Sequence, residues 1–202
     1  MSAGMEITMK QTDIINPFQP YMTLEMDGYS QINRTDYGIS HFYEFTIHDE
    51  KKHCIKAVPD ASIDLLFNIG ENKVSTYISG TVFGVKKWEL GTQDDCFGVR
   101  FQPGQGILPK DITMEMIVND DIEIDGDIFG KNLTEKIALA KTMSERIDIF
   151  KKAYEDIVLG RSSLSDKEKI NEYLVNRISR TKGMITMRQL EDETNYSACY
   201  LR

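Results

Sequence analysis

The sequence of 202 residues has few cysteines and no long apolar segment. Cys54, Cys96 and Cys199 are odd in number and widely spaced, so we expect reduced thiols instead of a disulfide framework. No apolar run is long enough to span a membrane. The first twenty residues include the charged Glu6 and Lys10 and lack the apolar core of a secretion signal. We therefore expect a cytoplasmic protein without a membrane partner.

Recognisable catalytic motifs are also missing. The sequence has no P-loop, no Gly-x-Ser-x-Gly and no Gly-x-Gly-x-x-Gly after a strand-like segment. The neighbouring base and nucleophile, His53 and Cys54, would lie on opposite faces of a strand because side chains alternate there. We therefore predict that the protein is not an enzyme and has no catalytic residue and no cofactor.

The sequence also lacks the residue patterns that are typical of metal-binding sites. His41, His48 and His53 include no His-x-His pair, and no second cluster completes a site. The acidic run from Asp121 imitates a calcium loop, but its twelfth position is Asn132 instead of the bidentate glutamate that such a loop needs. We expect no metal and interpret the run as an acidic segment that leaves the strand-rich region.

The negative charge is unevenly distributed along the chain. The net charge is −8, yet residues 161–202 contain eight Lys/Arg and only six Asp/Glu. The remainder is therefore strongly acidic and would repel DNA, whereas the mildly basic end would not. This distribution permits DNA binding by the C-terminal part without establishing it.

Residues 37–125 have the composition of short strands separated by turns. Gly70-Glu-Asn72 is typical of a hairpin, and Pro103-Gly-Gln-Gly106 predicts a turn. Many short strands at this spacing favour an antiparallel, cupin-like β-barrel, and the helices that follow make the fold class α+β. Residues 1–36 are expected to be irregular. The predicted strands cover Phe42–Ile47, Ile63–Ile69, Val74–Ile78, Thr81–Val85, Cys96–Gln102 and Met114–Val118.

From Asn132 the hydrophobic period becomes helical. Apolar residues recur in steps of three and four from Leu133 to Ile157, which predicts one long amphipathic helix or two shorter ones that end at Gly160. Asn132 and Glu135 are candidates for the N-terminal cap. The stripe is expected to pack partly on the barrel and partly on a second copy. The predicted division is a barrel over 1–130, a helical linker and dimerisation segment over 131–160, and a partial helix-turn-helix domain over 161–202.

The last 38 residues contain signals for helix starts and turns. Ser165 with Glu168 and Thr186 with Gln189 fit capping boxes, and Gly183 is a candidate helix end. Thr194-Asn195 breaks the second helix, and Ser197 is a candidate N-cap of a third. This order indicates a helix-turn-helix, although on spacing alone an ordinary helical hairpin packed against a core fits equally well.

Two parts of the sequence resemble AraC-type transcription regulators. The run Thr186-Met-Arg-Gln-Leu…Thr-Asn-Tyr-Ser197-x-x-Tyr-Leu-Arg202 is similar to the start of their DNA-binding domain. Ala57-Val-Pro-Asp-Ala-Ser-Ile-Asp64, followed by Phe97-Gly-Val-Arg-Phe-Gln-Pro-Gly104, resembles the N-terminal barrel of one branch of that family, with Ala61 in place of the usual glycine. Both halves occur in the order that the family uses.

The resemblance implies roles for the C-terminal residues. Ala198, Cys199 and Arg202 would face base edges, and Ser197 would lie near a phosphate. Glu191 and Asn195 stand where the family usually has a small residue and a glycine. Family domains carry two helix-turn-helix units, and this sequence contains only the beginning of the first. We therefore expect a truncated regulator.

Charged and aromatic residues in the strands suggest a pocket. Asp64 and Arg100 each lie in an apolar strand, so they are expected to pair, either as a structural ion pair or as the polar anchor of a ligand pocket. The aromatic residues that would line the pocket, or else form plain core, are Phe45, Phe67, Trp88 and Phe101.

The first hypothesis is a DNA-binding transcription regulator with a barrel that senses a small-molecule effector. It would act as a homodimer, and only the full-length protein would bind DNA well. The alternative is a small-molecule-binding barrel or barrel enzyme whose helical tail contacts another protein. A third possibility is a natural truncation that forms mixed dimers with a full-length relative and blocks it.

Overall fold

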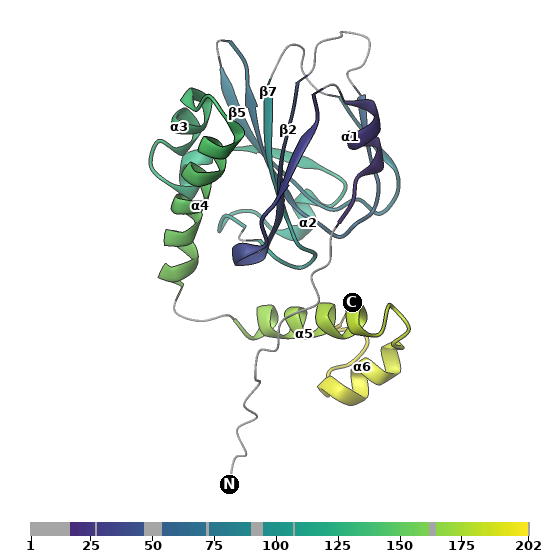
Figure 1. Cartoon of the computed structure of the whole chain (residues 1–202). Coiled ribbons are helices and arrows are strands. Elements are labelled where there is room, and N and C mark those ends of the chain that lie inside the picture. Colours follow the sequence, from purple (N-terminus) through teal and green to yellow (C-terminus); the bar gives the residue numbers. More distant parts are fainter. Residues whose placement is uncertain are drawn as a thin grey trace. The chain divides into compact units, whose positions relative to one another are not determined.

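The strand-rich region forms a twisted antiparallel sheet with two helices on one face (Figure 1). The computed structural model describes residues 17–26, 28–46, 54–71, 73–89, 95–106, 108–161 and 165–201. The helices are α1 (Pro20–Glu25), α2 (Met114–Ile117), α3 (Leu133–Leu139), α4 (Met143–Gly160), α5 (Asp166–Arg180) and α6 (Met187–Thr194), with 3₁₀ turns η1 (Asp36–Gly38) and η2 (Gly126–Phe129). The strands are β1 (Ser30–Asn33), β2 (Ile39–Thr46), β3 (Cys54–Ala57), β4 (Asp64–Ile69), β5 (Val74–Ser79), β6 (Lys86–Glu89), β7 (Asp95–Phe101) and β8 (Asp121–Ile124).

The strands belong to two sheets. The larger has the order β1-β2-β7-β4-β5-β8, and the smaller pairs β3 with β6. Every described pair is antiparallel. The α+β class is therefore confirmed. The closed, cupin-like barrel is not confirmed, because in the described part of the chain β1 and β8 are the unpaired edges of the larger sheet.

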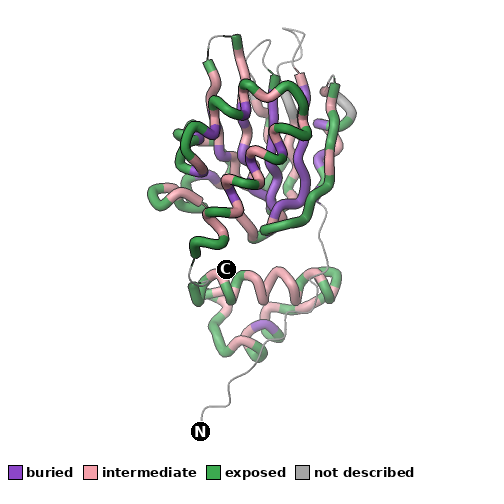
Figure 2. The backbone as a smooth tube through the Cα atoms, turned by 60° about the vertical axis from the view of Figure 1, so that its left-hand side comes forward, coloured by how far each residue is buried: buried purple, intermediate pink, exposed green. Residues whose placement is uncertain are grey.

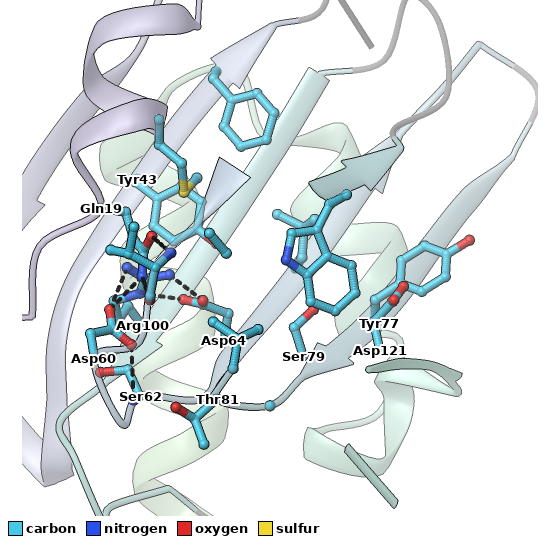
Figure 3. Close-up of a pocket in the computed structure, with 18 of the residues that line it drawn as sticks. Gln19, Tyr43, Asp60, Ser62, Asp64, Tyr77, Ser79, Thr81, Arg100 and Asp121 are labelled. Atoms are coloured by element: carbon cyan, nitrogen blue, oxygen red, sulfur yellow. Dashed lines mark hydrogen bonds and ion pairs between the residues drawn. The ribbon is translucent and has the colours of Figure 1, made fainter. Parts of the chain in front are cut away.

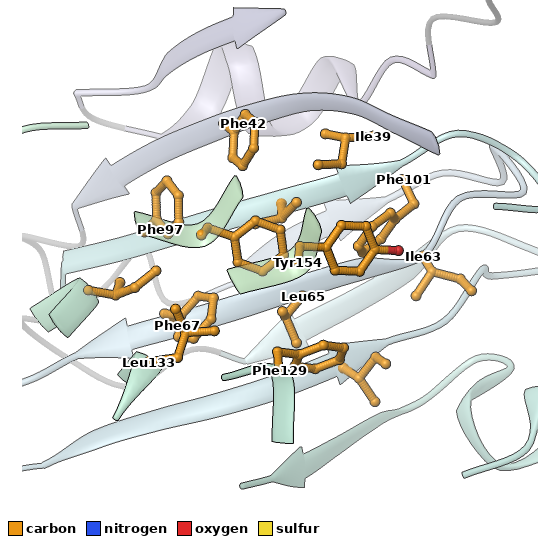
Figure 4. Close-up of a cluster of buried hydrophobic side chains, with 14 of the residues drawn as sticks. Ile39, Phe42, Ile63, Leu65, Phe67, Phe97, Phe101, Phe129, Leu133 and Tyr154 are labelled. Carbon is orange, nitrogen blue, oxygen red and sulfur yellow. The ribbon is translucent and has the colours of Figure 1, made fainter. Parts of the chain in front are cut away.

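The main hydrophobic core lies between the larger sheet and the helices α3 and α4 (Figures 2 and 4). Strand residues Phe42, Phe67 and Phe97 are completely buried there. Phe150 of α4 contacts Phe42 and Phe67 edge-on, with ring centroids 6.0 and 6.4 Å apart. Tyr154, one helical turn later, stacks on Phe150 at 5.4 Å. The predicted apolar stripe thus packs on the sheet of its own chain.

The helical stripe is divided into α3 and α4, one of the two predicted arrangements, and α4 ends at Gly160 as predicted. The predicted cap by Asn132 is wrong. Asn132 has φ 57° and makes no capping bond through its side chain. The Asp127 carboxylate instead accepts from the amides of Asn132 and Thr134, at 3.0 and 3.1 Å. A real capping box, Thr142 with Glu145, opens α4. Among the described helices, none has an apolar stretch of the length that a membrane crossing needs.

Two predicted strands are wrong. Residues 114–117 form the helical turn α2, in which Met114 and Met116 are exposed and Ile117 is buried. Met114 and Met116 alternate with other residues as in a strand, but their side chains do not lie on a buried face. Residues 81–85 are irregular, and Asn119 holds them by accepting from the Phe83 amide at 2.8 Å. Residues 1–36 are expected from the sequence to be irregular, but the described part of this segment contains α1 and β1.

The described chain divides into two compact units, Asn16–Leu164 and a second that contains Ser165–Arg202. Helices α3 and α4, predicted as a separate linker, belong to the unit that contains the sheets. In the second unit α5 and α6 both begin with the predicted capping boxes. Helix α5 ends in a Schellman motif, in which the amide of Lys182 donates to Ser179 and that of Gly183 to Ile178. Lys182 and the predicted Gly183 both have positive φ.

Candidate ligand-binding site

The face of the larger sheet opposite the α4 core borders a cavity of about 200 Å³. Side chains alternate between the two faces of each strand, so Phe97, Val99 and Phe101 of β7 point to the core while Arg100 points to the cavity. In β4, Asp64 and Leu66 border the cavity in the same way. Helix α1, the smaller sheet and the segments around residues 58–62 and 79–82 complete the lining.

A buried guanidinium with two carboxylates forms one end of the cavity (Figure 3). Arg100 Nε donates to Asp64 Oδ1 at 2.8 Å, and Nη2 donates to Asp64 Oδ2, so this pair is bidentate. Arg100 Nη1 donates to Asp60 Oδ2 at 3.1 Å. The Arg100 side chain is 5% exposed, and those of Asp60 and Asp64 are 12% and 15% exposed. Burial lowers the pKa of Arg100, but the charges of Asp64 and Asp60 outweigh it, so the net shift is upward.

Gln19, directly before α1, fixes Asp60 and the segment that follows β3. Its Oε1 accepts from the Val58 amide at 2.8 Å, and its Nε2 donates to Val58 O at 2.7 Å. The same Nε2 donates to Asp60 Oδ2 at 2.8 Å. The Ser62 amide donates to Asp60 Oδ1 at 3.1 Å, while the buried Ser62 hydroxyl has no hydrogen-bond partner among the residues that the structure describes. Asp60 is therefore held by neutral donors in addition to Arg100.

An aromatic shelf lies beside the ion cluster. The ring of Tyr43 stacks on Phe45, with centroids 6.2 Å apart, and the Arg100 guanidinium lies 5.9 Å from the Tyr43 centroid. Burial raises the pKa of Tyr43 well above its usual value, and the charge of Asp64 adds to this. A β-carbon at Gly98 would lie 2.0 Å from the Tyr43 ring, so glycine in this motif makes room for the shelf.

The opposite end of the cavity carries hydroxyl groups and one carboxylate. Ser79 of β5 lies directly opposite Asp121 of β8, and Tyr77 borders the cavity beside them (Figure 3). Burial raises the pKa of Asp121, while the nearby Lys86 lowers it. Lys86 lies 3.8 Å over the ring of Trp88, another residue of the lining.

His41 lies next to the ion cluster, opposite Arg100 in the β2–β7 ladder. It is 3% exposed, and its Nδ1 is 3.0 Å from the Ser40 hydroxyl. Burial lowers the pKa of His41 to about 4, and the charge of Arg100 contributes to the shift. His41 is therefore neutral at physiological pH. His48 and His53 lie outside the described residues.

Four of the six residues predicted for the pocket border the cavity, namely Phe45, Asp64, Trp88 and Arg100. Phe67 and Phe101 do not, because they occupy the other face and pack beneath α4. Phe67 is an odd number of positions from Asp64 on the same strand, and so is Phe101 from Arg100. Because side chains alternate between the two faces of a strand, the sequence could have placed both phenylalanines on the face away from the ion pair. Sequence reasoning missed Gln19, Tyr43, Asp60, Tyr77, Ser79 and Asp121.

The second candidate site is the turn after α6. Asn195 ends α6 with φ 59°, the left-handed conformation expected of a tight turn. Ser197 then opens a single helical turn, and its hydroxyl accepts from the Tyr200 amide at 3.4 Å. Glu191 Oε1 accepts from the Ala198 amide at 2.6 Å, so the side chain of Glu191 bonds to the start of the next turn. Cys199 is exposed, and Arg202 lies outside the described residues.

A family model described as "Domain of unknown function (DUF6597)" matches residues 37–123. This range spans β2 to β8 and contains both sequence motifs around Asp64 and Arg100, together with most of the cavity lining. No curated protein and no solved structure matches the chain.

Proposed function

We propose that the protein is a DNA-binding transcription regulator of the AraC type. In this proposal the unit with the cavity senses a small molecule, and α5, α6 and the following turn belong to the DNA-binding domain. The observation that supports it is the order of α6, left-handed Asn195 and the Ser197-capped turn, which is the order expected where the second helix of a helix-turn-helix begins.

The residues at that start suit contact with DNA. Ser197 and Cys199 are exposed, and Ala198 has a small side chain that allows close approach to base edges. Ser197 is suited to a phosphate, because a hydroxyl at a helix N-terminus donates hydrogen bonds where the helix dipole also favours an anion. Arg202 is proposed as a base contact on the resemblance alone.

The test uses the complete product of the native gene and a DNA segment from upstream of that gene. Fluorescence anisotropy should show sequence-selective binding that weakens as salt is added. A plot of the logarithm of the binding constant against the logarithm of the salt concentration should have a slope of about −0.9 for each phosphate contact. Ser197→Glu should weaken specific binding by at least about tenfold, because it places a carboxylate against a phosphate. Ser144→Glu, at an exposed site of α4, is the matched control and should leave DNA binding unchanged. Equal binding to unrelated DNA would contradict the proposal.

We also propose that the regulator is a homodimer, since two-fold proteins of this kind read paired half-sites. The buried part of the α4 stripe is occupied by the sheet, so the contact would use other surfaces. Leu139 and Leu159, which are 67% and 69% exposed, are candidates. Light scattering on the complete gene product would give its mass, and a monomer at micromolar concentration would exclude this part of the proposal.

The cavity favours the alternative function, a small-molecule-binding protein whose helices contact another protein. Its carboxylates Asp60 and Asp64 are engaged by Arg100, which suits a binding wall better than an acid–base pair. Tight binding of a metabolite, together with no DNA affinity of the complete gene product, would favour this alternative.

A further inference from the structure

The charges around the cavity have one predominant sign. Among the described residues, its lining contains the carboxylates of Asp60, Asp64 and Asp121 and one cation, Arg100. Arg100 binds both Asp60 and Asp64, so this buried end keeps one net negative charge. His41 beside it is neutral at physiological pH. An anionic ligand would meet this charge in a region of low dielectric, where repulsion is strong.

Lys86, a cation near Asp121, is not itself part of the lining. Lys86 Nζ donates to the backbone oxygen of Asn119 and lies 3.6 Å from Asp120 Oδ1. No ion pair is present between Lys86 and Asp121 among the described contacts, although Lys86 lowers the pKa of that carboxyl. Asp121 is therefore available at the end of the cavity opposite Arg100 (Figure 3).

Aromatic rings provide the second feature of the lining. Tyr43, Phe45, Tyr77 and Trp88 all border the cavity. Cations of the protein itself already lie on two of these rings, Arg100 at 5.9 Å from Tyr43 and Lys86 at 3.8 Å from Trp88. Ring faces attract cations through their quadrupole, and an aromatic wall with a carboxylate is a recognised arrangement for organic ammonium ions.

We propose that the cavity binds a small organic cation, an amine or quaternary ammonium, whose charge is balanced by Asp121 and whose carbon atoms contact Trp88 and Tyr77. The hydroxyls of Ser79 and Thr81, also in the lining, would bind a polar substituent. At about 200 Å³ the cavity is smaller than the usual pocket for a drug-sized molecule, so the ligand is a small metabolite.

The chain offers a direct assay, because Trp88 is its only tryptophan. Binding beside Trp88 should change the fluorescence of the full chain without any label. Three probes share nearly one carbon skeleton and differ in charge: choline is cationic, 3,3-dimethylbutan-1-ol is neutral and 3,3-dimethylbutanoate is anionic. We expect choline to bind saturably and at least about tenfold more tightly than the alcohol, with the anion weakest, as the field of the lining and cation–π attraction require.

Two variants test the role of the carboxylate. Asp121→Asn should weaken choline binding by about fivefold or more and leave the alcohol unchanged, since it removes charge at nearly constant shape. Asp111→Asn, an exposed carboxylate outside the lining, is the control and should change neither. A matching urea midpoint for each variant would show that the sheet unit remains folded.

Several results would overturn the inference. These are equal or tighter binding of the neutral or anionic probe, no effect of Asp121→Asn on choline, or no saturable choline binding up to about 10 mM, well above a millimolar dissociation constant. The inference rests on the proposed effector role of the cavity, but the assay contains no DNA. Failure with choline would therefore leave the DNA-binding proposal standing, and failure to bind DNA would leave a positive choline result intact.

Discussion

Replacing Arg100 by methionine should reveal how much the ion cluster contributes to the stability of the sheet unit. Methionine has a similar length but no charge, so Asp60 and Asp64 would remain buried against each other without a cation. Removing one partner of a buried ion pair costs about 3–5 kcal/mol, because the remaining charge stays desolvated. Here a bidentate bond to Asp64 and a further bond to Asp60 are lost together. We therefore expect a loss near the upper end of that range.

Urea unfolding followed by Trp88 fluorescence measures this loss in the unit that contains the cluster. With a slope of about 2 kcal/mol per molar urea, the midpoint should fall by about 2.5 M. Lys73→Met is a matched control. Lys73, directly before β5, pairs with Glu123 of β8, but their side chains are 70% and 49% exposed. This control should cost less than about 1 kcal/mol, because solvent screens an exposed pair.

A second substitution separates loss of charge balance from loss of packing. Adding Asp64→Asn to the Arg100→Met variant removes the carboxylate that Arg100 holds most closely, so part of the lost stability should return. A double variant less stable than the single one would mean that packing dominates. A loss below about 1 kcal/mol for Arg100→Met alone would refute the account of the cluster as a buried, charge-coupled unit.

Three further predictions concern the same unit and use the same unfolding assay. His41 has a folded-state pKa of about 4, below the unfolded value of about 6.5. Its contribution to the free energy of unfolding is therefore complete above pH 6.5 and falls by about 3 kcal/mol as the pH decreases toward 4. His41→Asn should remove this part of the pH dependence, and an unchanged profile would contradict the shift. Ala61→Gly should stabilise the unit by about 0.5–1 kcal/mol, because Ala61 has φ 59° and glycine adopts that conformation without the strain caused by a β-carbon. A lower urea midpoint would oppose this reasoning. Gly98→Ala should destabilise the unit by about 3 kcal/mol, since the new methyl group would overlap the Tyr43 ring. In a Tyr43→Ala background, where the ring is absent, the same Gly98→Ala change should cost much less.

The sequence allowed the periodic parts of the fold to be predicted. The helices around residues 133–160, the capping boxes at Ser165 and Thr186, and the turn at Asn195 all follow from local patterns. Local patterns failed at α2, where Met114 and Met116 alternate like strand residues but are exposed. They also failed at Asn132, because the cap comes from Asp127, whose position depends on the preceding 3₁₀ turn. Closure of a barrel depends on pairing between distant strands, and no local pattern reports that pairing.

The cavity was only partly predictable for a related reason. Asp64 and Arg100 could be paired because a charge in an apolar strand requires a partner. Asp60 could not be assigned to the same cluster from the sequence. Its contact with Arg100 depends on the conformation of the segment after β3 and on the hydrogen bond from Gln19, which is 41 positions from Asp60. The positive φ of Ala61 belongs to that conformation, because it lies in the turn that directs the Ser62 amide back to Asp60. A substitution that relaxes Ala61 should therefore leave the ion cluster in place, whereas one that removes Gln19 should loosen Asp60 without disturbing the bidentate bond of Asp64.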